Sequence, residues 1–125
     1  MKVLIIDDDA DIRSIARLSL SRVGGMDVIE AASGVEGVRK AQEEKPDVIL
    51  LDMMMPTMDG LETLAALRSQ PATARMPVIF LTAKAVRDEV EIMTALGAAG
   101  LLKKPFDPRT LSEDVRALVK RPLDS

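Results

Sequence analysis

Five short apolar runs alternate with five longer segments of helical spacing along the chain, and this alternation is the feature that most constrains the fold. The first run, Val3 to Ile6, is apolar throughout and stops at Asp7, which is typical of a strand buried on both faces of a parallel sheet. The predicted strands are 3–6, 26–31, 47–51, 78–81 and 101–102, and the predicted helices are 11–23, 35–44, 61–69, 87–96 and 108–119. The pattern therefore predicts an α/β fold, a parallel sheet with helices on both faces and right-handed crossovers.

The residues at the ends of the predicted helices agree with this reading. Asp8 and Asp9 precede the first helix as candidate caps, and the pair at 24–25, both glycine, ends it. Asp107 is the predicted cap of the last helix, with Pro108 at its first position.

Length and composition set the domain organisation. The 125 residues, 47 % of them apolar, suit one domain with one core. We expect a single domain over residues 1–121, a short tail at 122–125 and no output domain.

Charge and missing residue types exclude several classes of function. The net charge of −3 and pI of about 5.0 argue against a nucleic-acid footprint on this chain. No apolar run approaches the roughly 20 residues of a membrane span, so we expect no membrane partner and a cytoplasmic location. Without cysteine or histidine, any metal must be held by oxygen ligands, which favours Mg²⁺, Mn²⁺ or Ca²⁺.

The chemically capable side chains follow the predicted strands, where ligands of parallel α/β sheets bind. They are Asp7, Asp8 and Asp9 after the first strand, Asp52 after the third, Thr82 after the fourth and Lys104 after the fifth. Clustered carboxylates repel one another by roughly 4 kcal/mol per pair at 4 Å unless a cation offsets their charge. A carboxylate can also act as a nucleophile and form an aspartyl-phosphate, whose oxygens a metal, an ammonium and a hydroxyl can stabilise.

With these residues in this order, the chain resembles the receiver domains of bacterial two-component response regulators, the chemotaxis regulators among them. The resemblance covers almost the whole chain, and its segments are 3–9 (VLIIDDD), 50–56 (LLDMMMP), 58–60 (MDG), 81–83 (LTA) and 103–106 (KKPF). It implies a flavodoxin-like, doubly wound sheet of five parallel strands in the order 2-1-3-4-5, with five helices.

The resemblance also assigns roles in the chemistry. It implies that Asp52 is the phosphoacceptor and that Asp7 and Asp8 hold Mg²⁺ or Mn²⁺ together with Asp52, Asp8 being the more direct ligand. The backbone carbonyl of Met54 would complete the protein ligands.

Two further residues of the family pattern face the phosphoryl group. Thr82 would bond a phosphoryl oxygen and move toward it on activation. Lys104 would pair with the phosphoryl group, or with Asp52 before transfer, and the Lys104–Pro105 bond is expected to be cis.

Some positions depart from the commoner pattern or leave their role open. Leu101 stands where many receivers have Tyr or Phe, so coupling through a moving aromatic ring is in doubt. Met54 and Lys84 occupy positions that in the family tune how fast water reaches the phosphoryl group. Val86 and Val90 could form either core or an exposed partner-binding stripe.

The resemblance implies a signalling domain rather than a classical enzyme. A sensor histidine kinase, a phosphotransfer protein or a small phosphodonor would supply the phosphoryl group, and a downstream protein would read the result. A phosphorylation-dependent dimer is a further expectation.

Two alternatives stay open at this point. One is a receiver-like binding module that ignores phosphate. The other is a small Mg²⁺-dependent phosphatase with Asp7 as nucleophile and Asp9 as acid/base.

Overall fold

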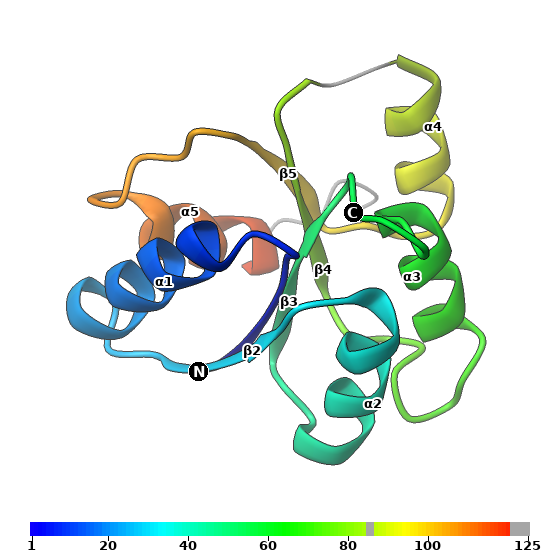
Figure 1. The fold of residues 1–125 in the computed structure, drawn as a ribbon, viewed down its shortest axis with the longest axis horizontal. Coiled ribbons are helices and arrows are strands. Elements are labelled where there is room, and N and C mark those ends of the chain that lie inside the picture. Colours follow the sequence, from blue (N-terminus) through cyan, green and yellow to red (C-terminus); the bar gives the residue numbers. More distant parts are fainter. Residues whose placement is uncertain (85–86, 121–125) are drawn as a thin grey trace.

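A computed structural model of the chain describes residues 1–84 and 87–120. It contains one sheet of five parallel strands in the order β2-β1-β3-β4-β5, as the resemblance implied (Figure 1). The strands are β1 (Lys2–Ile6), β2 (Asp27–Ala31), β3 (Val48–Asp52), β4 (Val78–Thr82) and β5 (Gly100–Lys103). The helices are α1 (Ala10–Leu18), η1 (Ser19–Val23), α2 (Gly34–Glu44), α3 (Gly60–Arg68), α4 (Arg87–Ala95) and α5 (Leu111–Lys120).

Helices cover both faces of the sheet, and each face has its own hydrophobic core. Helices α1 and α5 lie on one face, whereas α2, α3 and α4 lie on the other (Figure 1). Successive side chains of a strand point to opposite faces, so Leu50 joins the core under α1 and α5 while Leu51 joins the opposite one. This two-sided burial explains why β3 and β4 are buried at every position and why their sequences show no polar alternation.

The first predicted helix corresponds to two consecutive segments, the α-helix α1 and the π-helix η1. Asp9 caps α1 by accepting hydrogen bonds from the amides of Asp11 and Ile12, as its position predicted. The sequence predicted one helix to residue 23, but the last five residues form the π-helix η1. Gly24, directly after η1, lies against the start of α5. The approach is close, since a Cβ added at Gly24 would lie 2.6 Å from Cβ of Ser112. Helical spacing alone could not report that tertiary contact.

The start of the last helix was predicted too early. The α-helix begins at Leu111, and residues 108–110 form turns before it. The carboxylate of Asp107 accepts hydrogen bonds from the amide of Arg109 at 2.9 Å and from its guanidinium, so it caps the turn rather than the helix. The turn still leads into the helix, since the amide of Leu111 donates to the Asp107 carbonyl.

Three smaller expectations can be compared directly. The Lys104–Pro105 peptide bond is cis, as expected. Val90 is half-buried and packs on the core under α4, which favours the core reading at that position, whereas Val86 and the predicted tail at 122–125 lie outside the described residues. Within the described part of the chain, no helix is long and apolar enough to cross a membrane.

The double-sided burial of β3 makes a specific prediction for stability. Leu50 is fully buried, and Leu50→Ala should lower the free energy of unfolding by about 2–5 kcal/mol because a cavity remains between sheet and helices. Val35→Ala is the control: its side chain is 68 % exposed on α2, and the change should stay within about 0.5 kcal/mol. Urea unfolding followed by circular dichroism measures both, since the chain has no Trp or Tyr. Equal losses in the two variants would contradict the packing argument.

Candidate functional site

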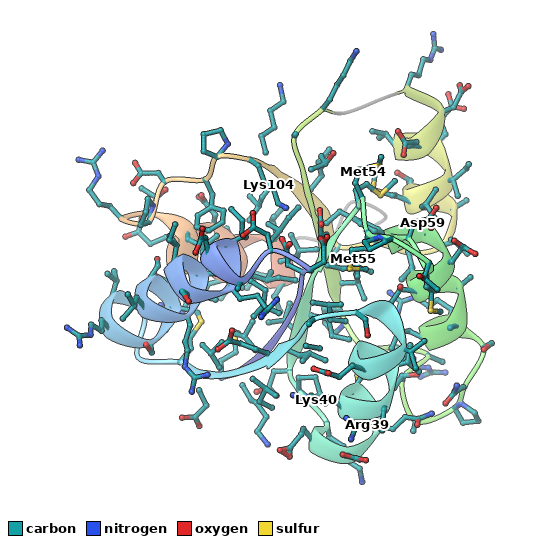
Figure 2. All side chains as sticks on the ribbon, viewed as in Figure 1. Arg39, Lys40, Met54, Met55, Asp59 and Lys104 are labelled. Carbon is teal, nitrogen blue, oxygen red and sulfur yellow. The ribbon has the colours of Figure 1, made fainter. Side chains whose placement is uncertain are left out.

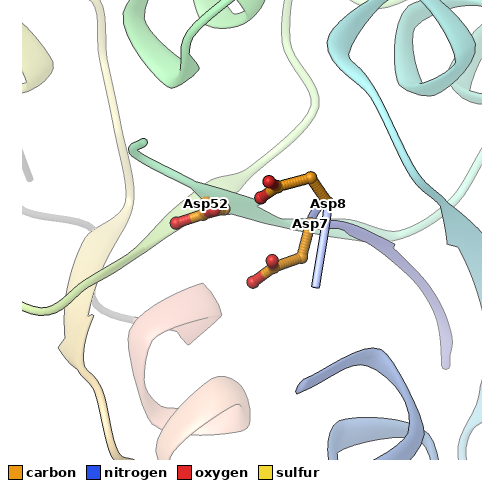
Figure 3. A group of neighbouring side chains, drawn as sticks. All are labelled: Asp7, Asp8 and Asp52. Carbon is orange, nitrogen blue, oxygen red and sulfur yellow. The ribbon is translucent and has the colours of Figure 1, made fainter. Parts of the chain in front are cut away.

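Two carboxylates are brought together by the pairing of β1 with β3. Ile6 pairs with Leu51 in parallel register, so the next residues, Asp7 directly after β1 and Asp52 at the end of β3, lie side by side. Both are buried, and the adjacent Asp8 is exposed. Figure 3 shows the three carboxylates at the same edge of the sheet, where one oxygen from each lies within 4.8 Å of the others.

Lys104, in the loop after β5, reaches the two buried carboxylates at the same edge of the sheet. Its Nζ donates to Oδ2 of Asp7 at 2.8 Å and to Oδ1 of Asp52 at 3.0 Å. The backbone places it there, since the Lys104 amide donates to the carbonyl of Thr82 at the end of β4. One ammonium group thus offsets two carboxylates that would otherwise be buried without a positive charge beside them.

Burial and mutual repulsion alter the acid–base behaviour of this pair. Burial, followed by the negative charge of Asp7, raises the pKa of Asp52 to about 6, although the hydrogen bond and charge of Lys104 act in the opposite direction. Burial alone would lower the pKa of Lys104, but its contacts with Asp7 and Asp52 outweigh burial and raise it. At neutral pH the ammonium is therefore charged and most of the Asp52 carboxylate is ionised.

The unused oxygens at this edge suit a hard divalent cation. Oδ1 of Asp7 accepts the amide of Asp9, and its Oδ2 accepts Lys104. Among residues 1–84 and 87–120, no hydrogen bond reaches Oδ2 of Asp52 or the carboxylate of Asp8. Carboxylate oxygens left free beside a buried acid are the donor type that Mg²⁺ and Mn²⁺ prefer, so the residues present fit such an ion.

Thr82 ends β4 at the same edge, but its hydroxyl faces its own loop. The hydroxyl donates to the carbonyl of Lys84 at 2.9 Å and accepts the amide of Lys84 at 3.3 Å. The side chain is buried, with 3 % exposure. The hydroxyl can therefore reach a group on Asp52 only by giving up its bond to the Lys84 carbonyl.

Met54 and Leu101 differ in their exposure to solvent. Met54 is 74 % exposed on the loop after β3, and in Figure 2 it lies in the upper half of the view, as Lys104 does, whereas Arg39 of α2 lies at the bottom. Its amide donates to Oδ1 of Asp52 at 3.4 Å, whereas the metal-binding role of its carbonyl stays a prediction. Leu101 is half-buried and packs against the core under α4.

The geometry speaks against Asp7 and Asp9 as a phosphatase pair. Asp7 is fully buried with both oxygens bonded, which leaves no lone oxygen facing a substrate. Oδ1 of Asp9 caps α1 by accepting the amides of Asp11 and Ile12. Asp7 is therefore not placed as the accessible nucleophile that the phosphatase alternative needs.

One contact at this edge was not predicted from the sequence. Arg13 of α1 donates from Nη1 to the backbone carbonyl of Asp7 at 2.7 Å and pairs with Glu30 of β2 at 3.2 Å. Helical spacing indicates that Arg13 follows Asp9 by one turn, but its partner on a separate strand depends on the β1–β2 register.

Comparison with known proteins gives one consistent family. Residues 3–116 match the family model described as the response regulator receiver domain. The chain is 39 % identical over 120 residues to the alkaline phosphatase synthesis transcriptional regulatory protein PhoP of Bacillus subtilis, covering 96 % of this chain and 49 % of that protein. It is 38 % identical over 121 residues to the DNA-binding dual master transcriptional regulator RpaA of Synechocystis, covering 96 % and 49 %. The chain thus spans about half the length of these curated relatives.

Solved structures agree in fold over nearly the whole chain. The chemotaxis protein CheY4 of Vibrio cholerae matches with a TM-score of 0.88 and 37 % identity, covering 94 % of this chain and 97 % of that one. A putative response regulator from Chloroflexus aurantiacus matches with a TM-score of 0.85 and 32 % identity, covering 96 % and 98 %.

The raised pKa of Asp52 predicts a pH-dependent stability in metal-free protein. Because the pKa rises from 3.8 to about 6 on folding, the folded state keeps a proton in this window that the unfolded chain has released. The stability contributed by protonated Asp52 is thus present at about pH 4 and is lost as pH rises through about 6. Asp52→Asn lacks this titration, so its free energy of unfolding should rise relative to that of the parent across the window.

Urea unfolding in a metal chelator at several pH values measures this difference. Asp27→Asn, which removes an exposed carboxylate from β2, controls for the loss of one charge. A difference between Asp52→Asn and the parent that stays flat, or falls as pH rises, would contradict the prediction.

Proposed function

Because the chain belongs to the response regulator receiver domain family, we propose that Asp52 accepts a phosphoryl group in a Mg²⁺-dependent reaction and that the phosphorylated domain signals by altered binding to another protein. The donor would be a sensor histidine kinase, a phosphotransfer protein or a small phosphodonor such as acetyl phosphate. The observation that best supports this is the convergence of Lys104 and three carboxylates at one edge of the sheet. A cytoplasmic location belongs to the same proposal.

The transfer follows from the ionised carboxylate of Asp52. A lone pair of one Asp52 oxygen attacks the donor phosphorus and forms an O–P bond. The bond from phosphorus to the donor nitrogen or oxygen breaks, and its electron pair leaves with the imidazole or acetate. Lys104, already 3.0 Å from Asp52, offsets negative charge on the phosphoryl oxygens as it builds up.

The free oxygens at the edge indicate which residues would hold the metal. Asp8 and Asp52 would bind it directly, with the Met54 carbonyl as a third protein ligand and Asp7 as the buried charge behind them. When bound, Mg²⁺ neutralises phosphoryl oxygens that would otherwise repel the carboxylates. The side chain of Met54 is free to face solvent because only its backbone is required.

Thr82 provides the link from the chemistry to the surface in this proposal. Its hydroxyl would leave the Lys84 carbonyl and donate to a phosphoryl oxygen. The loop after β4 then loses an anchoring hydrogen bond, which changes the surface that a partner meets. Leu101 cannot donate a hydrogen bond in response, so packing rather than an aromatic hydroxyl would transmit the change. Dimerisation of the phosphorylated domain is a further outcome consistent with this route.

One prediction of this proposal concerns the phosphoacceptor Asp52. Incubation with acetyl phosphate and Mg²⁺ should add the mass of one phosphoryl group to the parent, because an ionised carboxylate is available as nucleophile. Asp52→Asn should add none, whereas Asp9→Asn should behave as the parent, since Asn also caps helices. Intact-protein mass spectrometry reads all three. Equal labelling of Asp52→Asn and the parent would show that the acceptor lies elsewhere.

Another prediction of this proposal concerns binding of the metal. A ligand that binds only the folded state adds about 2.7 kcal/mol at 100 times its Kd, so Mg²⁺ should stabilise the parent by that amount at that concentration. Asp8→Asn should lose most of the gain because it removes an unpaired carboxylate from the edge. Asp9→Asn, one residue along with its carboxylate on the helix cap, should keep it. Urea unfolding with and without Mg²⁺ is the measurement, and a parent indifferent to Mg²⁺ would count against the site.

A further inference from the structure

Arg13 makes an unusual pair of contacts close to the proposed metal site. Its side chain is only 17 % exposed, and its guanidinium lies between the loop after β1 and the side chain of Glu30 on β2. Nη1 donates to the backbone carbonyl of Asp7 at 2.7 Å, and Nε donates to Oε1 of Glu30 at 3.2 Å. One planar, permanently charged group thus ties a loop carbonyl to a neighbouring strand.

The carbonyl that Arg13 holds belongs to the peptide unit that leads into Asp8. A peptide unit is planar, so fixing the Asp7 carbonyl also fixes the Asp8 amide and the direction in which the Asp8 chain leaves. This backbone restraint matters for Asp8, because among the described residues no hydrogen bond restrains its exposed carboxylate. The buried Asp7, in contrast, is held by its own side-chain bonds to Lys104 and to the Asp9 amide.

Glu30 gives the guanidinium its fixed anchor. It pairs with Ile5 in the β1–β2 register, so its position is set by the sheet rather than by a loop. Its second oxygen accepts Nη1 of Arg17 at 2.8 Å, which is a contact that does not involve Asp7. Arg17 therefore shares the Glu30 partner with Arg13 but lacks the bond to the loop.

We propose that Arg13, anchored on Glu30, is a positioning residue that holds the Asp7–Asp8 peptide so that the Asp8 carboxylate faces a divalent metal. This inference rests on the proposed function, since it assumes that a metal binds at this edge. Groups that orient metal ligands without touching the metal typically change affinity by about ten- to a hundredfold when removed. Arg13 would belong to this class although its contact is to backbone rather than to a ligand side chain.

The two arginines offer a matched test in the full chain. Arg13→Gln and Arg17→Gln each remove one positive charge and one ion pair with Glu30, but only the first removes the bond to the Asp7 carbonyl. Mn²⁺ is the probe, and loss of the electron paramagnetic resonance signal of the free ion gives its Kd. We expect Arg13→Gln to raise the Kd about tenfold or more, and Arg17→Gln to change it by less than about threefold.

A second readout needs no metal. The Asp8 amide belongs to the held peptide, so its nuclear magnetic resonance signal, recorded in a chelator, should shift or broaden in Arg13→Gln and not in Arg17→Gln. Arg13→Lys should restore the Kd only in part, because a single ammonium lacks the fork that reaches both acceptors. If Arg13→Gln does not fold, as judged by circular dichroism, Glu30→Gln decides: a raised Kd supports the inference and an unchanged Kd overturns it.

The outcomes separate this inference from the function on which it rests. A parent that binds no Mn²⁺ overturns the proposed metal site, and the inference with it. A parent that binds Mn²⁺, with Arg13→Gln binding equally well, overturns the role of Arg13 alone. Equal weakening in Arg13→Gln and Arg17→Gln also overturns it, because the effect would then come from the lost ion pair with Glu30, which both variants share, rather than from the bond to the Asp7 carbonyl.

Discussion

The bridge from Lys104 to Asp7 and Asp52 is the interaction on which the functional edge of this protein depends. Two carboxylates buried side by side are unfavourable unless a positive charge and hydrogen bonds accompany them. A single ammonium at 2.8 and 3.0 Å provides both, and it comes from the loop after β5, far from β1 and β3 in the sequence. The contact therefore links the two halves of the chain at the place where the chemistry is proposed.

The carboxylates around this bridge differ in how far hydrogen bonds restrain them. Asp7 has every side-chain oxygen bonded and acts as a fixed negative charge. Within the part of the chain that the structure describes, the Asp8 carboxylate and one oxygen of Asp52 accept no hydrogen bond, so the same cluster is bonded at its base and open toward solvent at Asp8. Such a division suits a site that must keep its shape while a metal and a phosphoryl group come and go. Arg13 extends the fixed part to the backbone of the open part.

In the proposed function, the route from the site to the rest of the molecule runs through Thr82 rather than through an aromatic side chain. In the structure its hydroxyl is bonded to the Lys84 carbonyl, and Leu101 packs on the core under α4. In that proposal, a change at Thr82 would alter first the loop after β4 and then the packing around α4. A Tyr at the Leu101 position could add a hydrogen bond to this response, whereas Leu101 has no donor with which to make one.

The sequence by itself determined the strand and helix order, the two-sided burial of the central strands and the candidate residues Asp7, Asp8, Asp52, Thr82 and Lys104. These follow from local patterns: apolar runs that stop at a polar residue, helical spacing and caps, together with a family resemblance covering nearly the whole chain. Tertiary structure decided what depends on distant segments meeting. The π-helical end of the first helix, the late start of α5, the Thr82–Lys84 bond and the Arg13–Asp7–Glu30 contact are of this kind. Strand register and helix docking fix such contacts, and a linear pattern contains neither.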